Sequence, residues 1–365
     1  MNRSTSVYLD AVRLFAALVV VLTHLGYPRF SGGLLLAFRT YGNDAVMVFF
    51  VLSGYVIAYT AATRDRDVGT YGVNRLARLY SVAVPAVFLT WLLDAAGSRL
   101  DPALYDGFWY RSSEPFRRVL EALTFTNQLW FHSTRLFSNG PYWSLGYEFW
   151  YYAIFAAGWY FSGWKRTALV AACAAIMGPK ILLLLPIWLL GAWVYRFNER
   201  SRITPAAGAA LFVGSIAFYA AFRATGMRDV LLGLTNAWLG EAFVRGKLTW
   251  SDEFLSSYVI GTLVAANFIG FHAISERVAP WMARGESVIR SSAGYTFSIY
   301  LFHYPLMQFL GAAFQPDPRS PLAIAALFFG TVLTCCALGT FTEKRKDLAR
   351  SLLRGQLRIR KPAAE

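Results

Sequence analysis

The stretch VYLDAVRLFAALVVVLTHLGY, residues 7–27, decides the fold class of this chain. It is long and apolar enough for one transmembrane helix, because about 20 apolar residues cross the hydrocarbon core of a bilayer. Three ionisable residues nevertheless lie inside it, namely Asp10, Arg13 and His24. Charged and titratable groups are costly inside a membrane, so each of the three is a candidate for a functional site.

Nine further apolar stretches follow along the chain. They cover residues 44–62, 78–96, 142–161, 167–178, 181–197, 205–223, 255–274, 293–314 and 321–341. We therefore expect an all-α polytopic membrane protein with about ten transmembrane helices. The stretch 167–178 is short and ends at Gly178-Pro179, which leaves nine or eleven spans open.

The composition excludes other classes of protein. Of the 365 residues, 56% are hydrophobic and 15% are charged, whereas a soluble domain carries about 25% charged residues. The net charge of +14 would suggest a nucleic-acid partner in a soluble protein. In a membrane protein it is explained by basic cytoplasmic loops, so we expect no nucleic-acid partner.

The cysteines and histidines do not form a metal-binding pattern. Cys173, Cys335 and Cys336 lie in apolar stretches, and no Cys-x-x-Cys or His-Glu-x-x-His spacing occurs in the sequence. We expect three free thiols, no disulfide framework and no metal site.

The distribution of basic residues predicts the orientation. In the ten-helix arrangement 21 of the 35 Lys and Arg residues lie on the side of the N-terminus and 13 on the opposite side, with Arg13 inside the first helix. Both termini are therefore predicted to be cytoplasmic, in a multi-pass protein of the inner membrane. Residues 1–342 form the predicted membrane domain, and residues 343–365 form a short basic cytoplasmic tail.

The first helix carries its polar residues along one stripe. Arg13 and His24 are eleven residues apart, which places them within about 20° of the same helix face and ~16 Å apart along the axis. Asp10 lies one turn before Arg13. The alternative is purely structural, with Asp10 and Arg13 paired to make the helix tolerable in the membrane and His24 packed at the interface.

Two carboxylates are predicted to lie near His24. Asp44 begins the second span and Glu148 lies about seven residues into the fourth, so both fall near the outer layer that holds His24. A carboxylate beside an imidazole fixes its tautomer and raises its basicity, as a general base requires. The alternatives are a helix N-cap for Asp44 and a hydrogen-bonded packing group for Glu148.

Three more features stand out in the predicted spans and loops. Arg75 and Arg78 share one helix face, which suits a phosphate-rich ligand, although taken alone they are explained more simply as positive charges that anchor the cytoplasmic side. His303 precedes Pro305 in mid-membrane and either lines a cavity or packs on a backbone carbonyl. Outer aromatic residues such as Trp143 can stack on sugar rings or mark the membrane interface.

Five short motifs occur in one order along the chain. They are LDAVR at residues 9–13 with Arg13-x10-His24, FFVLSG at 49–54, Arg75-x-x-Arg78, WSL at 143–145 with Glu148, and SIYLFH at 298–303. In this order they resemble the membrane-bound acyltransferase-3 family over residues 9 to about 305. The resemblance implies a ten-helix enzyme that transfers an acyl group, usually acetyl, from cytoplasmic acyl-CoA to a hydroxyl of an extracytoplasmic or lipid-linked glycan.

The resemblance also implies roles for single residues. Arg13, His24, Arg75 and Arg78 match positions that the family requires for function. The sequence departs from the family pattern where many members have an acidic residue: Met47 stands before the Phe-Phe pair, and Phe149 follows Glu148.

From this resemblance we expect a membrane-bound, acyl-CoA-dependent O-acyltransferase without a bound cofactor. Arg13, Arg75 and Arg78, with Asp10, are expected to hold acyl-CoA, the co-substrate. His24 is expected to act as general base or to accept the acyl group, oriented by Glu148 or Asp44. Trp143 and His303 are expected to bind the acceptor, which is an O-antigen, an exopolysaccharide or a similar glycan among the membrane lipid.

Two other classes of function stay open. In a transporter or flippase, Asp10, Arg13, His24 and Glu148 would form a substrate or proton path. In a non-catalytic scaffold for glycan assembly, substitutions of Arg13 and His24 would be harmless.

Overall fold

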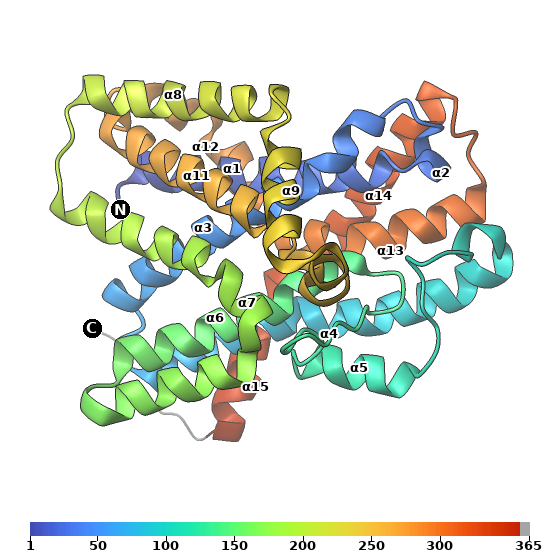
Figure 1. Cartoon of the computed structure of the whole chain (residues 1–365), viewed down its shortest axis with the longest axis horizontal. Helices are drawn as coiled ribbons and strands as arrows, with labels where there is room; N and C mark the ends of the chain where they lie inside the picture. The colour runs from blue at the N-terminus through green and yellow to red at the C-terminus, as the bar shows by residue number, and fades with distance from the viewer. Residues whose placement is uncertain (358–365) are drawn as a thin grey trace.

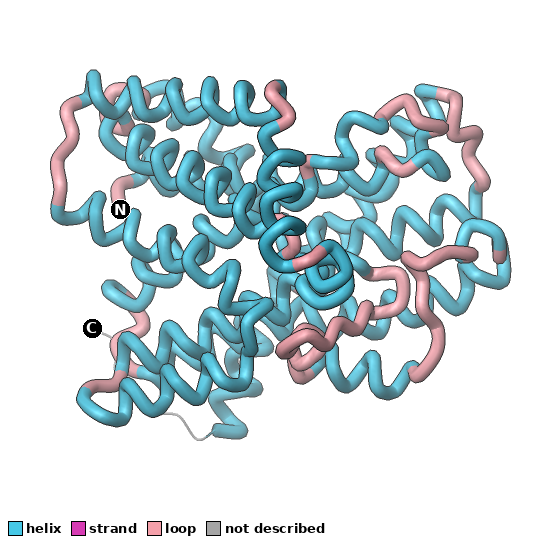
Figure 2. The backbone as a smooth tube through the Cα atoms, viewed as in Figure 1, coloured by secondary structure: helices cyan, strands magenta, loops and turns pink. Residues whose placement is uncertain are grey.

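A computed structural model describes residues 1–357 of the chain, and in these residues it contains helices and loops but no strand. The long helices are α1 (Arg3–Leu25), α3 (Gly42–Thr63), α4 (Val68–Leu100), α6 (Trp143–Tyr160), α7 (Gly163–Arg200), α8 (Pro205–Ala224), α11 (Phe254–Ile274), α13 (Thr296–Phe314) and α14 (Pro321–Phe341). The shorter helices are α2 (Pro28–Ser31), α5 (Pro115–Leu123), α9 (Met227–Leu239), α10 (Glu241–Phe243), α12 (Ala279–Ala293) and α15 (Lys346–Leu357). Most long helices run along the longest axis of the molecule (Figure 1). Figure 2 shows that most loop segments are short, apart from those on either side of α5.

The all-helical, membrane-spanning class is confirmed, but the number of ten spans is not. Within residues 1–357, seven stretches are long and apolar enough to cross a membrane: α1, α3, α4, α7, α8, and the stretches Glu241–Ile274 and Pro321–Arg354, which contain α11 and α14. The other two long helices, α6 and α13, carry several Tyr, His, Gln and Glu side chains that lower their hydropathy. The predicted cytoplasmic position of both termini stays a prediction.

The predicted stretches 167–178 and 181–197 lie in one helix with a break. Gly178 has a φ of 73°, a left-handed conformation that favours glycine, and Pro179 follows it. The break leaves carbonyl groups without helical partners. Trp130 satisfies two of them, because its backbone N–H donates to Met177 O and its indole Nε1–H to Ala175 O, both at 2.9 Å. The loop before α6 is thereby fastened to the middle of α7.

The helices α3 and α7 cross with their backbones in contact. A Cβ atom on Gly54 would lie 1.9 Å from Trp188 O, and one on Gly191 would lie 1.8 Å from Val51 O. Small residues permit such close crossings in membrane proteins, where packing replaces the hydrophobic effect as the force between helices. The crossing fixes the position of Ser53, which precedes Gly54 and enters the site described below.

The predicted C-terminal tail is partly helical. Within residues 343–365, α15 occupies Lys346–Leu357 and packs against α4. Residues 358–365 lie outside the described part of the chain. The division at residue 342 and the cytoplasmic side of the tail stay predictions.

Candidate active site

The larger of two neighbouring cavities has a volume of about 820 Å³, and His24 is in its wall. Ligand pockets commonly measure about 300–1,000 Å³. We call it the His24 cavity. It is formed where the C-terminal end of α1 meets α2, the start of α3, α13 and the loops around α5, and its characteristic lining residues are His24, Tyr27, Arg29, Trp109, Arg135, Trp143, Trp250 and Tyr304.

The ring of His24 is held by the fully buried His303. The ring nitrogen Nδ1 of His24 lies 2.9 Å from Val20 O and 3.1 Å from Nε2 of His303. Nδ1 of His303 lies 2.9 Å from Ile299 O and 2.8 Å from Tyr300 O. Two imidazoles and three backbone carbonyls therefore form one chain of hydrogen bonds.

This chain of hydrogen bonds selects one tautomer for each ring. Carbonyl oxygens only accept hydrogen bonds, so Nδ1 of His303 carries the proton and Nε2 holds a lone pair. Nδ1 of His24 faces that lone pair and Val20 O, and must therefore donate. In the neutral pair Nε2 of His24 is then unprotonated, and it has no hydrogen-bond partner among residues 1–357. It is available to a ligand in the His24 cavity.

A second, narrower cavity of about 50 Å³ lies toward the N-terminal half of α1. We call it the Arg13 cavity, and its polar lining residues are Arg13, Ser53, Arg78, Ser144, Glu148, Tyr152, Thr296 and Tyr300. Ser53 Oγ donates to Glu148 Oε1 at 2.8 Å and accepts from Trp188 Nε1 at 3.1 Å. The hydroxyl of Tyr152 also donates to Glu148. The carboxylate is thus fixed in the cavity that Arg13 and Arg78 also line.

Val46 and Tyr300 line both cavities and therefore form the wall between them. The hydroxyl of Tyr300 lies 2.7 Å from Ser144 Oγ and donates to Pro141 O at 3.0 Å. These hydrogen bonds hold the ring in place. The predicted stripe on α1 is thus found with one residue on each side of this wall, Arg13 in one cavity and His24 in the other.

The predicted group of Arg13, Arg75 and Arg78 is only partly brought together. Arg13 and Arg78 line the Arg13 cavity, whereas Arg75 pairs with the buried Asp65 at 3.1 Å. Asp10 lies 3.6 Å from Nη1 of Arg13 and 3.2 Å from Nη1 of Arg290 on α12. The i,i+3 contact that was the structural alternative for Asp10 and Arg13 is therefore present.

The expected contact of His24 with Asp44 or Glu148 is not found. Glu148 lines the Arg13 cavity, across the wall from His24. Asp44 lines neither cavity, accepts a hydrogen bond from the Tyr219 hydroxyl at 2.7 Å and lies 3.4 Å from Arg223. Nor is it an N-cap, because Tyr41 occupies that position and Asp44 lies in the first turn. The sequence placed the three residues at one depth but could not show which helix faces are in contact.

Of the two predicted acceptor-binding residues, one lies in the His24 cavity. Trp143 lines it and stacks on Trp250, with ring centroids 5.2 Å apart and planes inclined by 2°. His303 lines neither of the two cavities, because the ring of His24 lies between it and the open space. Because His303 lies behind His24, it is placed to position the His24 ring and does not face the space where an acceptor would bind.

Sequence reasoning missed the four arginines of the His24 cavity, Arg29, Arg39, Arg135 and Arg228. All four lie in predicted loops, where an arginine is expected to be a solvated charge. It also missed Tyr152, which lies one helical turn after Glu148 and could have been found from that i,i+4 spacing.

Comparisons with known proteins agree with the family resemblance of the five sequence motifs. A family model described as an acyltransferase domain, that of acyltransferase-3, matches residues 6–340. The chain is 34% identical over 164 residues to acyltransferase MdmB of Streptomyces mycarofaciens, an alignment that covers 42% of this chain and 38% of that protein. It is 21% identical over 322 residues to an O-acetyl transferase of Shigella phage Sf6, covering 82% of this chain and 84% of that protein.

No solved structure matches the chain at a significant level. The family model, however, covers nearly all of the sequence, including both cavities and every motif quoted above. The chain therefore belongs to the acyltransferase-3 family.

Proposed function

We propose that the protein transfers an acyl group, acetyl in the simplest case, from cytoplasmic acyl-CoA to a hydroxyl of a glycan on the outer side of the inner membrane. The observation that carries the proposal is the free Nε2 of His24 in a large cavity, one wall away from the two arginines of a narrow cavity. A general base for the acceptor hydroxyl and guanidinium groups that contact the donor are parts that acyl transfer from acyl-CoA uses.

We place only the acyl end of the donor in the Arg13 cavity. Its volume of about 50 Å³ is too small for a nucleotide or for the whole pantetheine arm, so the adenosine and phosphates of acyl-CoA would stay outside it. Arg13 and Arg78 supply guanidinium groups for phosphate or amide oxygens of the donor. Arg75 would act indirectly: its ion pair with Asp65 holds the beginning of α4, the helix that carries Arg78.

His24 supplies the proton transfer. An acceptor hydroxyl in the His24 cavity donates its proton to Nε2 while its oxygen attacks the thioester carbonyl. The C–O bond forms, the C–S bond breaks, and the proton passes from the imidazolium to the leaving thiolate. In the alternative route Nε2 attacks first and carries the acyl group to the hydroxyl; both routes need Nε2 unprotonated.

The proposal is tested with purified protein in lipid vesicles, radiolabelled acetyl-CoA and glycan from the producing cells. His24→Ala is expected to lower acyl transfer by at least about 10²-fold, the usual contribution of a general base. His272→Ala is the matched control, because this histidine contacts Thr5 and lines neither cavity.

Two results would contradict the proposal. Acyl transfer by His24→Ala at the rate of the control variant would remove His24 from the chemistry. Movement of glycan across the membrane without acyl-CoA, with no label incorporated, would favour a transporter or flippase.

A further inference from the structure

The His24 cavity is lined by more basic than acidic side chains. Four arginines line it, namely Arg29, Arg39, Arg135 and Arg228, and Asp101 is the one acidic residue among the lining residues that the structure describes. Arg228 is neutralised by Glu253, with Nη2 at 2.6 Å and Nε at 2.9 Å from its two carboxylate oxygens. The other three arginines form no ion pair within residues 1–357. The cavity therefore keeps an excess of positive charge.

Aromatic rings hold these guanidinium groups in place of carboxylates. The Arg29 guanidinium carbon lies 4.2 Å from the ring centre of Trp109 and 4.7 Å from that of Tyr27. Arg39 lies 4.9 Å from Tyr27 on the same basis, and Arg135 lies 5.6 Å from Trp250. A guanidinium stacked on a ring is fixed in direction and keeps N–H groups on its edge for a planar anion.

The arrangement is unfavourable without an anion. Nε of Arg29 is buried and has no hydrogen-bond partner in the described residues. Burial lowers the pKa of Arg29, and the neighbouring charge of Arg39 lowers it further. Burial likewise lowers the pKa of Arg135, and the neighbouring charges of Arg111 and Arg29 lower it further. Like charges gathered in a partly buried space are stabilised by a bound counter-charge.

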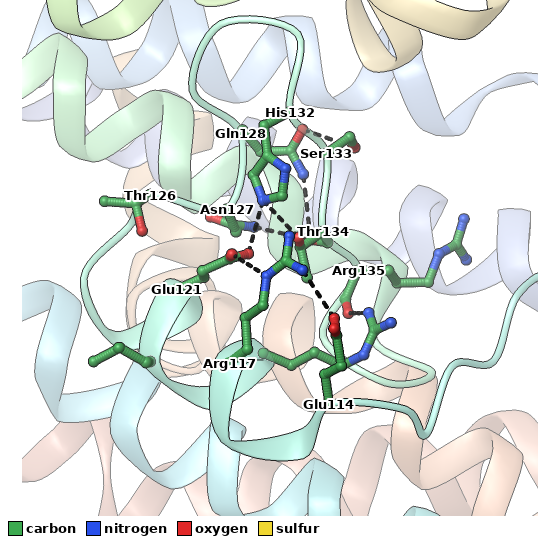
Figure 3. Close-up of polar contacts among 12 residues, drawn as sticks. Glu114, Arg117, Glu121, Thr126, Asn127, Gln128, His132, Ser133, Thr134 and Arg135 are labelled. Carbon is green, nitrogen blue, oxygen red and sulfur yellow. Dashed lines mark hydrogen bonds and ion pairs between the residues drawn. The ribbon is translucent and has the colours of Figure 1, made fainter.

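The backbone of Arg135 is held in position by a polar network that joins its loop to α5. Arg118 Nη1 donates to Arg135 O at 2.7 Å. His132 Nε2 lies 2.9 Å from Glu121 and 2.7 Å from Thr134 Oγ1. Figure 3 shows the contacts of His132 with Glu121 and Thr134, with Arg135 at the edge of the network. The guanidinium itself donates from Nη1 to Trp109 O at 3.3 Å, and a group held in this way loses little entropy when it binds a ligand.

The charged region adjoins the reactive nitrogen. The Tyr304 hydroxyl accepts a hydrogen bond from Arg29 Nη2, and its ring centre lies 4.6 Å from that of His24. An anion between Arg29 and Arg135 would thus lie about one side chain from Nε2 of His24, near enough to decide which hydroxyl of a sugar meets the base.

We propose that the acceptor is an anionic glycan, whose carboxylate or phosphate binds between Arg29 and Arg135 while its sugar rings pack on Trp109, Trp143 and Trp250. The inference rests on the proposed function and narrows its substrate class. The negative charge has two sources with the same chemistry, an acidic sugar or the pyrophosphate of a lipid carrier.

Binding is measured with the full chain in nanodiscs, without acyl donor. The probes are a glucuronate-containing trisaccharide, its glucose counterpart, and a neutral trisaccharide linked to polyprenyl pyrophosphate. An acidic probe is expected to bind at least about tenfold more tightly than its neutral counterpart, as two charged hydrogen-bonded contacts imply. Tight binding of the glucuronate probe assigns the charge to the sugar, and tight binding of the lipid-linked probe alone assigns it to the carrier.

The arginines are then tested one at a time. Arg29→Gln and Arg135→Gln are each expected to weaken binding of the acidic probe about tenfold and to leave the neutral probe unchanged. Arg29→Lys and Arg135→Lys keep the charge and should retain part of the preference, which separates loss of charge from misfolding. The exposed Arg99 on α4 lines neither cavity, so Arg99→Gln is the matched control.

The inference and the proposed function fail in different ways. Equal binding of acidic and neutral probes, unchanged by the glutamine variants, overturns the inference even if a neutral glycan is acylated. Arginine-dependent binding of an anion by a protein that acylates no glycan supports the inference and overturns the proposed function. His24→Ala should keep its anion binding in either case.

Discussion

The two cavities hold their arginines in different ways. In the Arg13 cavity the guanidinium of Arg13 faces the carboxylate of Asp10, and the fixed carboxylate of Glu148 lines the same space. In the His24 cavity Arg29 and Arg135 face aromatic rings. A carboxylate neutralises the charge it orients, whereas a ring orients the guanidinium and leaves most of its charge available. Under the proposed function, the first arrangement would suit one constant donor, and the second would keep an excess of positive charge for an acceptor.

The largest effect is expected for His303→Ala, which removes the partner of the base. Without this partner, the tautomer and the orientation of the His24 ring are no longer fixed. We therefore expect kcat to fall about 10²-fold while both KM values change little. His303→Gln should recover part of the rate, because its amide oxygen can accept from His24 Nδ1–H. The measurement is steady-state kinetics over a range of pH.

His303 was first predicted to bind the acceptor, and the same kinetics decide between the two roles. A raised KM for the acceptor with an unchanged kcat would support that role and contradict positioning.

A smaller effect is expected in the Arg13 cavity. Arg78→Gln should raise KM for acyl-CoA about tenfold, because a charged hydrogen bond to the donor is lost. KM for the acceptor should stay constant, since Arg78 does not line the His24 cavity. The exposed Arg64 provides the control, Arg64→Gln. A parallel rise in both KM values would show that the two cavities do not separate donor from acceptor.

The wall between the cavities gives a further test. Tyr300→Ala should open a path for water to the thioester and raise hydrolysis of acyl-CoA in the absence of acceptor by a few-fold, roughly, as expected when water is no longer excluded. Tyr300→Phe keeps the ring and loses only the hydrogen bonds to Ser144 and Pro141, so its hydrolysis should stay low. Equal hydrolysis in both variants would show that the ring does not separate the cavities.

The smallest effect concerns the loop that carries Arg135. Burial raises the pKa of Glu121, but hydrogen bonds from Thr134, Arg117 and His132 outweigh it and hold the pKa below its ordinary value. A carboxyl group with a lowered pKa stabilises the fold above its unfolded pKa and loses this contribution as the pH falls through its folded pKa. Glu121→Gln should therefore lower Tm near neutral pH, by an equivalent of at most ~1 kcal/mol.

The difference in Tm between this variant and the wild type should shrink as the pH falls below about 4. Thermal unfolding in detergent at several pH values measures it. A difference that grows toward acid pH would contradict this account of the network.

The helices and the stripe on α1 could be predicted because they depend on local pattern. Apolar length placed every predicted span on a helix, and the 3.6-residue period placed Arg13 and His24 along one helix. The contacts between helices could not be predicted in this way. The partner of His24 comes from a residue 279 positions later, and the rotation of α13 that presents His303 depends on packing along the whole helix.

The positions of loop residues could not be predicted from the sequence either, for a different reason. Nothing in the sequence around Arg135 distinguishes it from other loop arginines such as Arg111. Its role depends on where the loop is tied down, which involves Trp130 against the break at Gly178 and Lys180 Nζ donating to His132 O at 2.6 Å. Such ties join segments that have no regular spacing in the sequence.

The crossing of α3 and α7 at Gly54 and Gly191 has a consequence for motion. Two backbones in direct contact leave no room for one helix to rock over the other, and a rocking bundle is what alternating-access transport requires. Under the proposed function, the acyl group would pass between the two cavities by a rotation of the Tyr300 side chain, without movement of α3 relative to α7. In that case α3 and α7 would keep their relative position while the Tyr300 side chain moves. A small acyl group could then pass between the cavities, and both large substrates would stay on their own sides.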